Sequence, residues 1–220
     1  MLYIVSTPIG NLEDITLRGL RILKEVDYIA AEDTRHTQIL LKKYEIVKRI
    51  LSFHAFSSSH KTEKIINFLK DGKNIALVSD AGTPGISDPG YVLVKRAIEE
   101  NIEISPIPGP SAFLTALSGS GLPVNKFIYL GFLPIKKGRQ TLFKQFLDEK
   151  RTIVFYESPH RIIKTLNQLL DVLGDRNIVL ARELTKMYEE FLRGSLSEII
   201  ENLKNKNKVN GEFVVILGGK

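Results

Sequence analysis

Residues 75–90 read IALVSDAGTPGISDPG, an apolar run that passes directly into a loop rich in glycine and proline. The run IALVS is apolar throughout rather than alternating, which is typical of a strand in a sheet that helices cover on both faces. The twelve residues of the loop, Ser79–Gly90, include three glycines and two prolines. Glycine lets backbone approach a ligand closely, and proline holds a loop in one shape. The segment therefore predicts a buried parallel strand that ends in a binding loop.

The rest of the first half repeats this alternation of short apolar runs and helical patterns. Strands are expected at Leu2–Thr7, Tyr28–Glu32, Ile50–Phe53, Ile75–Ser79 and Ile102–Ile107, and helices at Thr16–Val26, Arg35–Tyr44, Lys61–Asp71, Tyr91–Glu100 and Pro110–Leu117. In the first helix Leu17, Leu20, Leu23 and Val26 fall three apart and predict one apolar face. A βαβ series of this kind forms an open parallel sheet.

Around residues 118–125 the pattern breaks at SGSGLPVN, which suits a linker. Beyond it, the strands FIYLGFLP, TIVFYES, NIVLAREL and FVVILGG alternate with helices near Gly138–Leu147, Pro159–Leu173 and Leu196–Lys204. The chain is therefore expected to be an α/β protein of two α/β domains, residues 1–118 and 119–220. Ser158 is expected to cap a helix that begins at Pro159. The dense charges of residues 182–194 form either a solvated face or part of a site.

Four strand ends of the first domain carry small polar residues, glycine or proline. These ends begin at Ser6, Glu32, Ser79 and Pro106. Ligands of open parallel sheets bind beyond the carboxyl ends of the strands, so four such loops on one edge favour a binding site over ordinary turns. The chain has no GxxxxGK[ST] or GxSxG motif, and no GxGxxG follows the first strand. These absences argue against a phosphate-loop NTPase, an α/β-hydrolase and a dinucleotide enzyme.

Composition excludes further classes. The chain has no cysteine, which rules out disulfides, thiolate zinc sites and a cysteine nucleophile. Its four histidines lack the spacing of metal ligands, so no bound metal is expected. The net charge of +6 is compatible with a polyanionic partner and equally with a lysine-rich surface. No apolar run approaches the roughly 20 residues of a membrane span. The first residues, MLYIVSTPIG, read as a strand rather than a signal peptide, so a cytoplasmic location is expected.

Seven segments together fit one known pattern. They are STPIGNLEDIT, AEDTRHT, SDAGTPGISDPG, IPGPSA, FYESPHR, RELTKMYEEFLRG and GEFVVILGG, in order from Ser6 to Gly219. In this combination the chain resembles the tetrapyrrole methylase superfamily, and most closely its members that methylate ribosomal RNA. The resemblance covers essentially the whole chain.

This resemblance implies two α/β domains with S-adenosylmethionine (AdoMet) in the trough between them, usually in a homodimer. It also implies 2'-O-methylation of the ribose of a cytidine in the decoding region of small-subunit ribosomal RNA. The substrate is either the free RNA or the RNA within the assembled subunit. The positions that match the family's cofactor contacts are Pro8, Asp80, Ala81, Gly82, Ile86, Ser111 and Ala112 in the first domain, and Tyr156, Glu157, Glu183, Leu184, Glu212 and Phe213 in the second.

A methyltransferase that acts on a ribose hydroxyl needs a base within hydrogen-bond reach of that hydroxyl. The candidate catalytic residues are Glu32, Asp33, Arg35, Glu183 and Lys186. Asp33 or Lys186 would act as the base, and Arg35 would grip a phosphate. Asp33 could instead cap the helix that begins near Arg35, and Lys186 could instead pair with Glu189 or Glu190.

Basic residues expected to contact RNA are Arg35, Lys136, Lys137, Arg139, Arg161 and Arg193. The loop of residues 134–139 either grips RNA or is a solvated turn before a helix. Three other functions stay open. They are a methylase of a small molecule such as a precorrin or of a protein side chain, a non-catalytic RNA-binding module on the same fold, and a nucleotide-binding regulator, which the missing phosphate loops disfavour.

Overall fold

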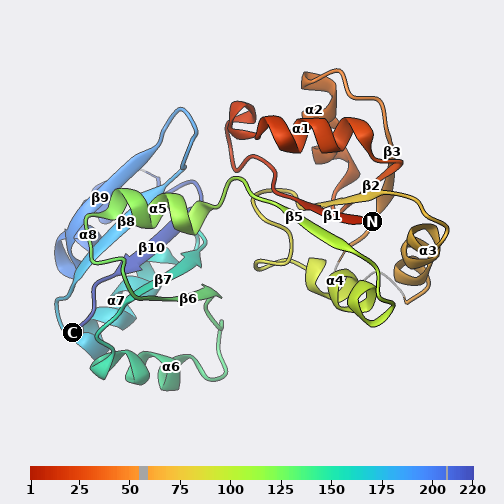
Figure 1. Ribbon diagram of the computed structural model, residues 1–220. Helices are drawn as coiled ribbons and strands as arrows, with labels where there is room; N and C mark the ends of the chain where they lie inside the picture. The colour runs from red at the N-terminus through yellow and green to blue at the C-terminus, as the bar shows by residue number, and fades with distance from the viewer. Residues whose placement is uncertain (55–58, 207) are drawn as a thin grey trace. The chain divides into compact units, whose positions relative to one another are not determined.

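The computed structural model describes residues 1–54, 59–206 and 208–220 (Figure 1). The chain forms two compact units, Met1–Ser111 and Ala112–Lys220, each with its own five-stranded sheet. This confirms the α/β fold class with two α/β domains. The expected boundary between residues 118 and 119 falls inside helix α5 (Ala112–Ser120), all of which belongs to the second unit.

The first unit is the open parallel sheet that the alternating pattern predicts. Its elements are β1 (Leu2–Val5), η1 (Leu12–Asp14), α1 (Leu17–Glu25), β2 (Tyr28–Ala31), α2 (Thr34–Lys43), β3 (Arg49–Ser52), α3 (Ser59–Lys70), β4 (Ile75–Val78), α4 (Gly90–Glu99) and β5 (Ile104–Ile107). The strand order is β3-β2-β4-β1-β5, and every neighbouring pair is parallel. The carboxyl ends of all five strands therefore lie on one edge of this sheet.

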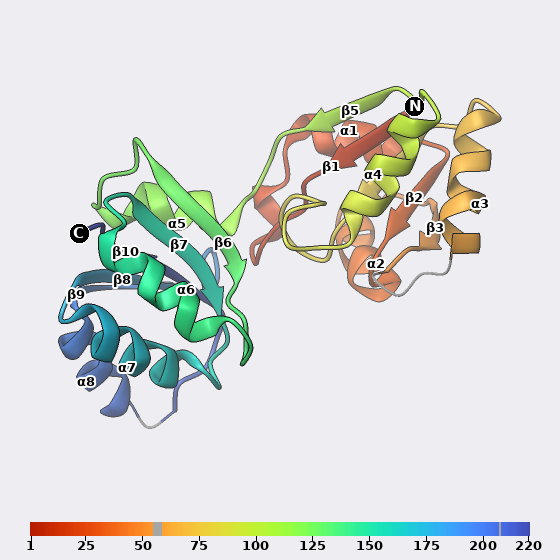
Figure 2. The same cartoon turned by 90° about the horizontal axis from the view of Figure 1, so that it is seen from below.

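Helices cover both faces of the first sheet (Figure 2). Successive side chains of a strand point to opposite faces. Ala76 and Val78 of β4 join the apolar cluster of α1 and α2, whereas Ile75 and Leu77 join the cluster of α3 and α4. All four residues of β4 are buried, which explains why this run is apolar throughout.

The buried face of α1 differs from the predicted one. Leu17 is 87% exposed, whereas Ile22, Leu23 and Val26 are buried. Since an α-helix has about 3.6 residues per turn, residues three apart drift round the helix instead of staying on one face. Over the nine steps from Leu17 to Val26 this drift amounts to about half a turn, so the predicted apolar face was wrong at its first position, Leu17.

The second unit holds a mixed sheet. Its elements are α5, β6 (Phe127–Phe132), α6 (Arg139–Gln145), η2 (Phe146–Asp148), β7 (Thr152–Glu157), α7 (Ile162–Leu173), β8 (Asn177–Arg182), β9 (Glu190–Ser195), α8 (Leu196–Lys204) and β10 (Phe213–Leu217). The strand order is β6-β7-β10-β8-β9, in which only β6 and β7 are parallel. Helices α6, α7 and α8 share an apolar core with this sheet, and α5 lies on its opposite face (Figure 2).

Strand β9 was not among the strands predicted from the sequence. It is an edge strand that pairs only with β8, and charged side chains are common on such edges because they discourage pairing with other chains. Glu190 of this strand also forms two ion pairs. The Arg182 guanidinium lies 3.2 Å from the carboxylate of Glu190, its register partner, and Lys206 lies 2.6 Å from the same carboxylate.

The start of α7 was also predicted wrongly. The helix begins at Ile162 with Arg161 as its N-cap, and no side chain caps it. Ser158 contributes its backbone instead, since its carbonyl oxygen accepts hydrogen bonds from the N–H groups of Arg161 and Ile162, each over 3.0 Å. Pro159 therefore lies in a turn that precedes the helix.

Candidate functional site

Two backbone hydrogen bonds join the end of β1 to the loop that follows β4. The N–H of Thr7 donates to the carbonyl oxygen of Gly82, and the N–H of Gly82 donates to that of Thr7, each over 2.9 Å. Gly82 has a φ of +82°, a conformation that favours glycine. The candidate cofactor residues Pro8 and Ala81 directly flank this bridge, so the structure brings these two loops of the first unit together.

Asp88 closes the loop of residues 79–90 on itself. Its Oδ1 accepts hydrogen bonds from the N–H of Gly85 over 2.6 Å and from that of Gly90 over 2.7 Å. A Cβ at position 90 would lie 2.8 Å from the nitrogen of Gly85, so only glycine fits this approach. Ile86, another candidate contact, is exposed near the tip. Asp88 was not among the residues predicted for the site, although an aspartate close to two loop glycines is a known signal for side-chain closure of a turn.

Gly109 brings the loop after β5 against the end of β1. A Cβ at position 109 would lie 2.9 Å from the Cβ of Ser6. The Ser6 hydroxyl lies 2.9 Å from that of Thr83, which donates to the carbonyl oxygen of Pro110 over 3.3 Å. The loops after β1, β4 and β5 therefore meet, and the candidate residue Ser111 follows directly. The contribution of Thr83 depends on two distant partners, so no local motif could have indicated it.

Asp33 is the N-cap of α2, as the alternative interpretation of the sequence held. Its Oδ1 accepts a hydrogen bond from the backbone N–H of Arg35 over 2.8 Å, and the Arg35 guanidinium contacts both carboxylate oxygens at 3.1 and 2.7 Å. The side-chain and backbone hydrogen bonds from Arg35 hold the pKa of Asp33 far below its usual range. A carboxylate with so low a pKa is a weak proton acceptor.

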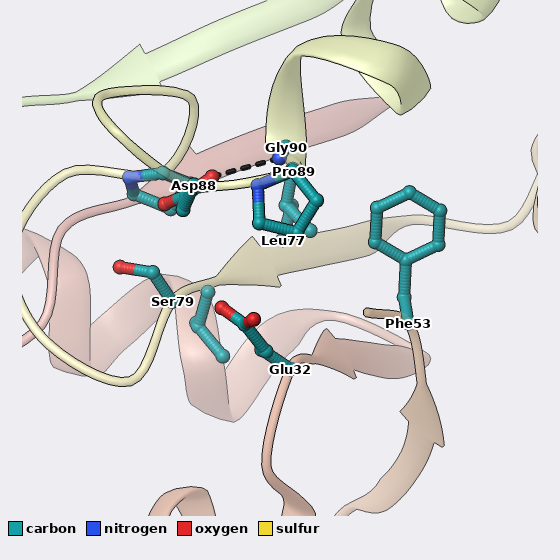
Figure 3. A pocket seen from close by; sticks show the side chains of 9 residues that line it. Glu32, Phe53, Leu77, Ser79, Asp88, Pro89 and Gly90 are labelled. Carbon is teal, nitrogen blue, oxygen red and sulfur yellow. Dashed lines mark hydrogen bonds between the residues drawn. The ribbon is translucent and has the colours of Figure 1, made fainter. Parts of the chain in front are cut away.

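Glu32, by contrast, faces a small hollow at the same sheet edge (Figure 3). The hollow is lined by Glu32, Phe53, Leu77, Val78, Ser79, Pro84, Asp88, Pro89 and Gly90. Burial raises the pKa of Glu32, and the charges of Asp80 and Asp88 raise it further, while His54 acts in the opposite direction. Burial is also the main cause that raises the pKa of Asp88. Carboxylates that repel one another in this way are stabilised by a bound cation.

In the second unit, Lys186 holds two carboxylates together. Its Nζ lies 3.1 Å from Oε1 of Glu183 and 3.0 Å from Oε2 of Glu212. Burial by itself would lower the pKa of Lys186, but the hydrogen bonds and charges of Glu212 and Glu183 outweigh it and raise that pKa. Lys186 thus keeps its proton at neutral pH. Its partners are not Glu189 or Glu190, so the pairing suggested from the sequence was wrong.

The remaining candidates of the second unit lie at the adjoining ends of three strands. In the sheet register, Phe213 of β10 pairs with Glu157 of β7 on one side and with Arg182 of β8 on the other. Leu184 follows β8 and is buried, as is Phe213. Tyr156 packs against Phe132 at 5.3 Å between ring centroids, and burial raises its pKa.

The buried side chain of Glu157 is fully engaged. One oxygen accepts from the N–H of Ser158 and lies 2.8 Å from the Arg161 guanidinium, and the other accepts from the Thr165 hydroxyl over 2.7 Å. Arg139 lies 3.8 Å from the same carboxylate. The side chain of Glu157 is therefore not available to a ligand.

Four of the basic residues expected to contact RNA have structural partners, and one of them is Arg35, which pairs with Asp33. Arg139 is buried and donates to Gln168, Pro134 and Thr165, so its expected place in an RNA-gripping loop was wrong. The Arg193 guanidinium donates to the carbonyl oxygens of Gly119 and Ser120 at the end of α5. Arg161 pairs with Glu157, as described above. Lys136 and Lys137, by contrast, are exposed.

Within residues 1–54, 59–206 and 208–220, no three acidic or histidine side chains are grouped so that they could hold a metal ion. In the same ranges no helix combines the length and the apolar character that a membrane span requires.

The sequence matches one family model and relatives that share one name. The model of the Tetrapyrrole (Corrin/Porphyrin) Methylases family matches residues 1–200. A protein from Thermotoga maritima named ribosomal RNA small subunit methyltransferase I is 52% identical over 219 residues, which cover 100% of this chain and 98% of that protein. A protein of the same name from Escherichia coli O157:H7 is 50% identical over 221 residues, which cover 99% of this chain and 77% of that protein.

Solved structures show the same fold at low sequence identity. The methyltransferase CobJ superimposes with a TM-score of 0.72 at 16% identity, covering 99% of this chain and 93% of that chain. The cobalt precorrin-4 methyltransferase CbiF superimposes with a TM-score of 0.70 at 17% identity, covering 99% of this chain and 94% of that chain. At this identity the likeness establishes the fold alone.

Proposed function

The chain belongs to the tetrapyrrole methylase family, and from that premise we propose that it is an AdoMet-dependent methyltransferase that 2'-O-methylates the ribose of a cytidine in the decoding region of small-subunit ribosomal RNA. One observation carries the proposal. The chain is 52% identical, over its whole length, to a protein named ribosomal RNA small subunit methyltransferase I.

The first unit offers a suitable place for the methionine end of AdoMet. We assign Pro8, Asp80, Ala81, Gly82, Ile86 and Ser111 to this end of the cofactor. Gly82 and Gly90 are buried and let the parts of this loop approach one another closely, and the loop exposes Ala81 and Ile86 to a ligand. AdoMet also carries positive charge on its sulfonium and ammonium groups, and the mutually repelling carboxylates of Glu32, Asp80 and Asp88 complement that charge.

The second unit offers residues for the adenosine end, and we assign Tyr156, Glu157, Glu183, Leu184, Glu212 and Phe213 to it. Ala112 follows Ser111 in the chain, and we assign it together with Ser111. Leu184 and Phe213 are buried, and the Glu157 side chain is engaged, so these three would contribute backbone groups. Tyr156 and Glu212 would contribute side chains.

When bound, AdoMet supplies a methyl group that is already activated. Glu32 is the best-placed proton acceptor for the ribose hydroxyl because it faces the hollow and its pKa is raised. Asp33 orients Arg35, whose exposed guanidinium would hold a phosphate of the RNA. The ammonium group of Lys186 neutralises the carboxylates of Glu183 and Glu212. Lys186 therefore holds these two residues together and does not act as a base.

The same proposal includes three further points that follow from the ribosomal substrate and the family. The enzyme works as a homodimer, it acts on RNA within the assembled small subunit, and it works in the cytoplasm. Sedimentation and a comparison of free ribosomal RNA with small subunits as substrate would test the first two.

The decisive experiment transfers labelled methyl groups from AdoMet to small ribosomal subunits that lack the modification, followed by analysis of the nucleosides. Label on the 2'-oxygen of one cytidine is the expected result. Absence of label on RNA, with AdoMet binding shown separately, would reject the RNA substrate and leave a small-molecule or protein methylase. Absence of both AdoMet binding and label would leave a non-catalytic RNA-binding module.

A further inference from the structure

Five aromatic rings form a continuous row on the α5 side of the second sheet. Phe113 of α5 lies 6.3 Å from Phe127 and 4.3 Å from Tyr129 of β6, measured between ring centroids. Tyr129 lies 5.6 Å from Tyr156 of β7, which lies 5.3 Å from Phe132 at the end of β6. Each ring thus contacts the next, and such contacts hold aromatic side chains in defined orientations.

The two end rings of this aromatic row are open to solvent. Phe132 is 58% exposed and Phe127 is 36% exposed. The three inner rings are shielded more and form a fixed backing for them. β6 lies at the edge of its sheet, and the loop that follows it leads away from the strand toward α6 (Figure 2). Contiguous exposed apolar patches, unlike single exposed residues, commonly mark an interaction site.

The chain around the aromatic row is free of negative charge. Residues 112–147 contain no aspartate or glutamate but five basic residues. Of these, only Arg139 is buried, and Lys126, Lys136, Lys137 and Lys144 are exposed. None of these four lysines forms an ion pair with another residue that the structure describes. Their charges are therefore available to an anionic partner.

The basic side chains also lie close to the exposed rings. Lys126 is the neighbour of Phe127 in the chain, and Lys136 is four residues beyond Phe132. Four residues of chain span at most about 14 Å. A single strand of RNA whose bases stack on these rings can therefore place its phosphates beside the ammonium groups. Exposed aromatic rings flanked by lysines are the usual means by which proteins bind single-stranded nucleic acid.

We infer that the aromatic row of β6, with Phe132 and Phe127 as its exposed ends, is a stacking platform for unpaired bases of the RNA substrate, and that Lys126, Lys136 and Lys137 hold the flanking phosphates. The inference rests on the proposed RNA substrate and adds where that RNA binds. It also gives the basic residues of this loop two separate roles. The buried Arg139 holds the start of α6 in place, and the exposed lysines bind the RNA.

The charge of the region distinguishes this ligand from a second copy of the chain. An interface between two identical surfaces would bring the lysines of residues 112–147 against one another, and like charges facing each other weaken association. An RNA strand, in contrast, brings a phosphate to each ammonium group.

The test measures binding of a fluorescent single-stranded oligocytidylate by the full chain and by four variants. Phe132→Leu keeps an apolar side chain but loses the ring, and we expect it to weaken binding about tenfold. Phe132→Tyr keeps the ring and should bind within about twofold of the parent. The double variant Lys136→Ala with Lys137→Ala should reduce the slope of log K against log salt by about 1.4, since each phosphate contact to a single strand contributes about 0.7. Ile98→Ala, an exposed apolar position on α4, is the control and should bind as the parent does.

Three results would overturn the inference. The first is equal RNA binding by Phe132→Leu and the parent. The second is weaker AdoMet binding by Phe132→Leu with unchanged RNA binding, which would make Phe132 part of the cofactor site. The third is a shift of the variant from dimer to monomer with unchanged RNA binding, which would make the row a contact between subunits.

Methyl transfer to small subunits, measured on the same proteins, separates this inference from the proposed function. If the parent transfers methyl groups and Phe132→Leu does so with an unchanged KM, only the inference fails. If the parent binds the oligonucleotide through Phe132 but transfers no methyl group to small subunits, the platform stands and only the proposed function fails.

Discussion

The backbone N–H of Asp33 donates a hydrogen bond to Oδ1 of Asp80 over 2.9 Å. This bond links the residue that caps α2 to the first residues of the loop after β4, two segments that are 47 positions apart in the chain. The strand ends that carry the candidate cofactor site of the first unit are thus tied to the strand end that carries the candidate base.

Two substitutions at Asp80 separate its charge from this hydrogen bond. Asp80→Asn keeps an oxygen acceptor and loses the negative charge, so we expect thermal stability close to that of the parent and AdoMet affinity lowered about tenfold. Asp80→Ala also loses the acceptor and should lower the free energy of unfolding by a further 1 kcal/mol or so, about the contribution of one hydrogen bond. Calorimetric titration and thermal denaturation measure the two effects. Asp71→Asn, an exposed carboxylate after α3, is the control, and equal AdoMet affinity for Asp80→Asn and the parent would remove Asp80 from the site.

Glu32→Gln should abolish most of the turnover. Loss of a general base lowers the rate about 100-fold or more, and the measurement is single turnover at saturating AdoMet so that weaker cofactor binding does not contribute. The parent's rate should fall as the pH drops through the raised pKa of Glu32, because the protonated acid cannot accept a proton. The variant should lack this dependence on pH.

The same substitution should not destabilise the protein at neutral pH. Because the pKa of Glu32 is raised in the folded state, the contribution of this group to stability is full below its unfolded pKa and is lost as the pH rises through the folded pKa. Ionised Glu32 thus opposes folding at pH 7. A melting temperature of Glu32→Gln well below that of the parent at this pH would show that Glu32 is instead stabilised as the anion.

Asp33→Asn and Lys186→Met test the two bases suggested by the sequence. Both residues are held in ion pairs that make them poor proton acceptors, Asp33 by its lowered pKa and Lys186 by its raised pKa. We expect turnover within about tenfold of the parent for both variants, at least an order of magnitude above Glu32→Gln. A rate for either variant as low as that of Glu32→Gln would return the role of base to that residue.

Gly109→Ala should disrupt the meeting of the loops after β1 and β5. The new Cβ would lie 2.9 Å from the Cβ of Ser6, closer than unbonded carbons approach, and such overpacking costs about 1–3 kcal/mol. Urea denaturation measures the loss, and AdoMet affinity should fall in parallel. Gly72→Ala is the comparison, since nothing lies within 4 Å of its new Cβ and its cost comes only from a φ of +80°. Equal losses of AdoMet affinity in the two variants would show that the contact with Ser6 has no part in binding.

Arg139→Ala should unfold the second unit more easily without a specific effect on RNA binding. Removing the guanidinium leaves the buried carboxylate of Glu157 still paired with Arg161, so we expect a loss of stability below the roughly 3–5 kcal/mol of a fully broken buried pair. Lys137→Ala, two residues earlier and exposed, should leave stability unchanged. Unchanged stability of Arg139→Ala would show that Arg161 alone compensates Glu157.

Much of the first unit could be predicted because its signals are local. The apolar run of β4, the helical patterns between the strands and the glycines of residues 79–90 all reflect the burial or the backbone conformation of the residues themselves. The same signals identified the strand ends at which the candidate site lies. Seven ordered motifs then identified the family, and the comparisons with known proteins confirm it.

The features that were missed or wrong have partners far along the chain. Arg139 is basic and lies beside two exposed lysines, yet it is buried because Gln168 and Thr165 face it from α7. Lys186 pairs with Glu212, 26 positions away, because Gly211 leaves room for the Glu183 side chain beside it. β9 is a strand because β8 offers it a free edge.

The amino-acid sequence therefore determined the class of fold, the family and the edge of the first sheet where small and polar residues gather, since each depends on local pattern and composition. Only the tertiary structure decided which charges of that edge and of the second unit are available for chemistry. A pKa depends on burial and on charges brought close by folding. Asp33 and Lys186 resemble Glu32 as candidates in the sequence, but folding gives the first two a close partner of opposite charge and places Glu32 near Asp80 and Asp88 instead.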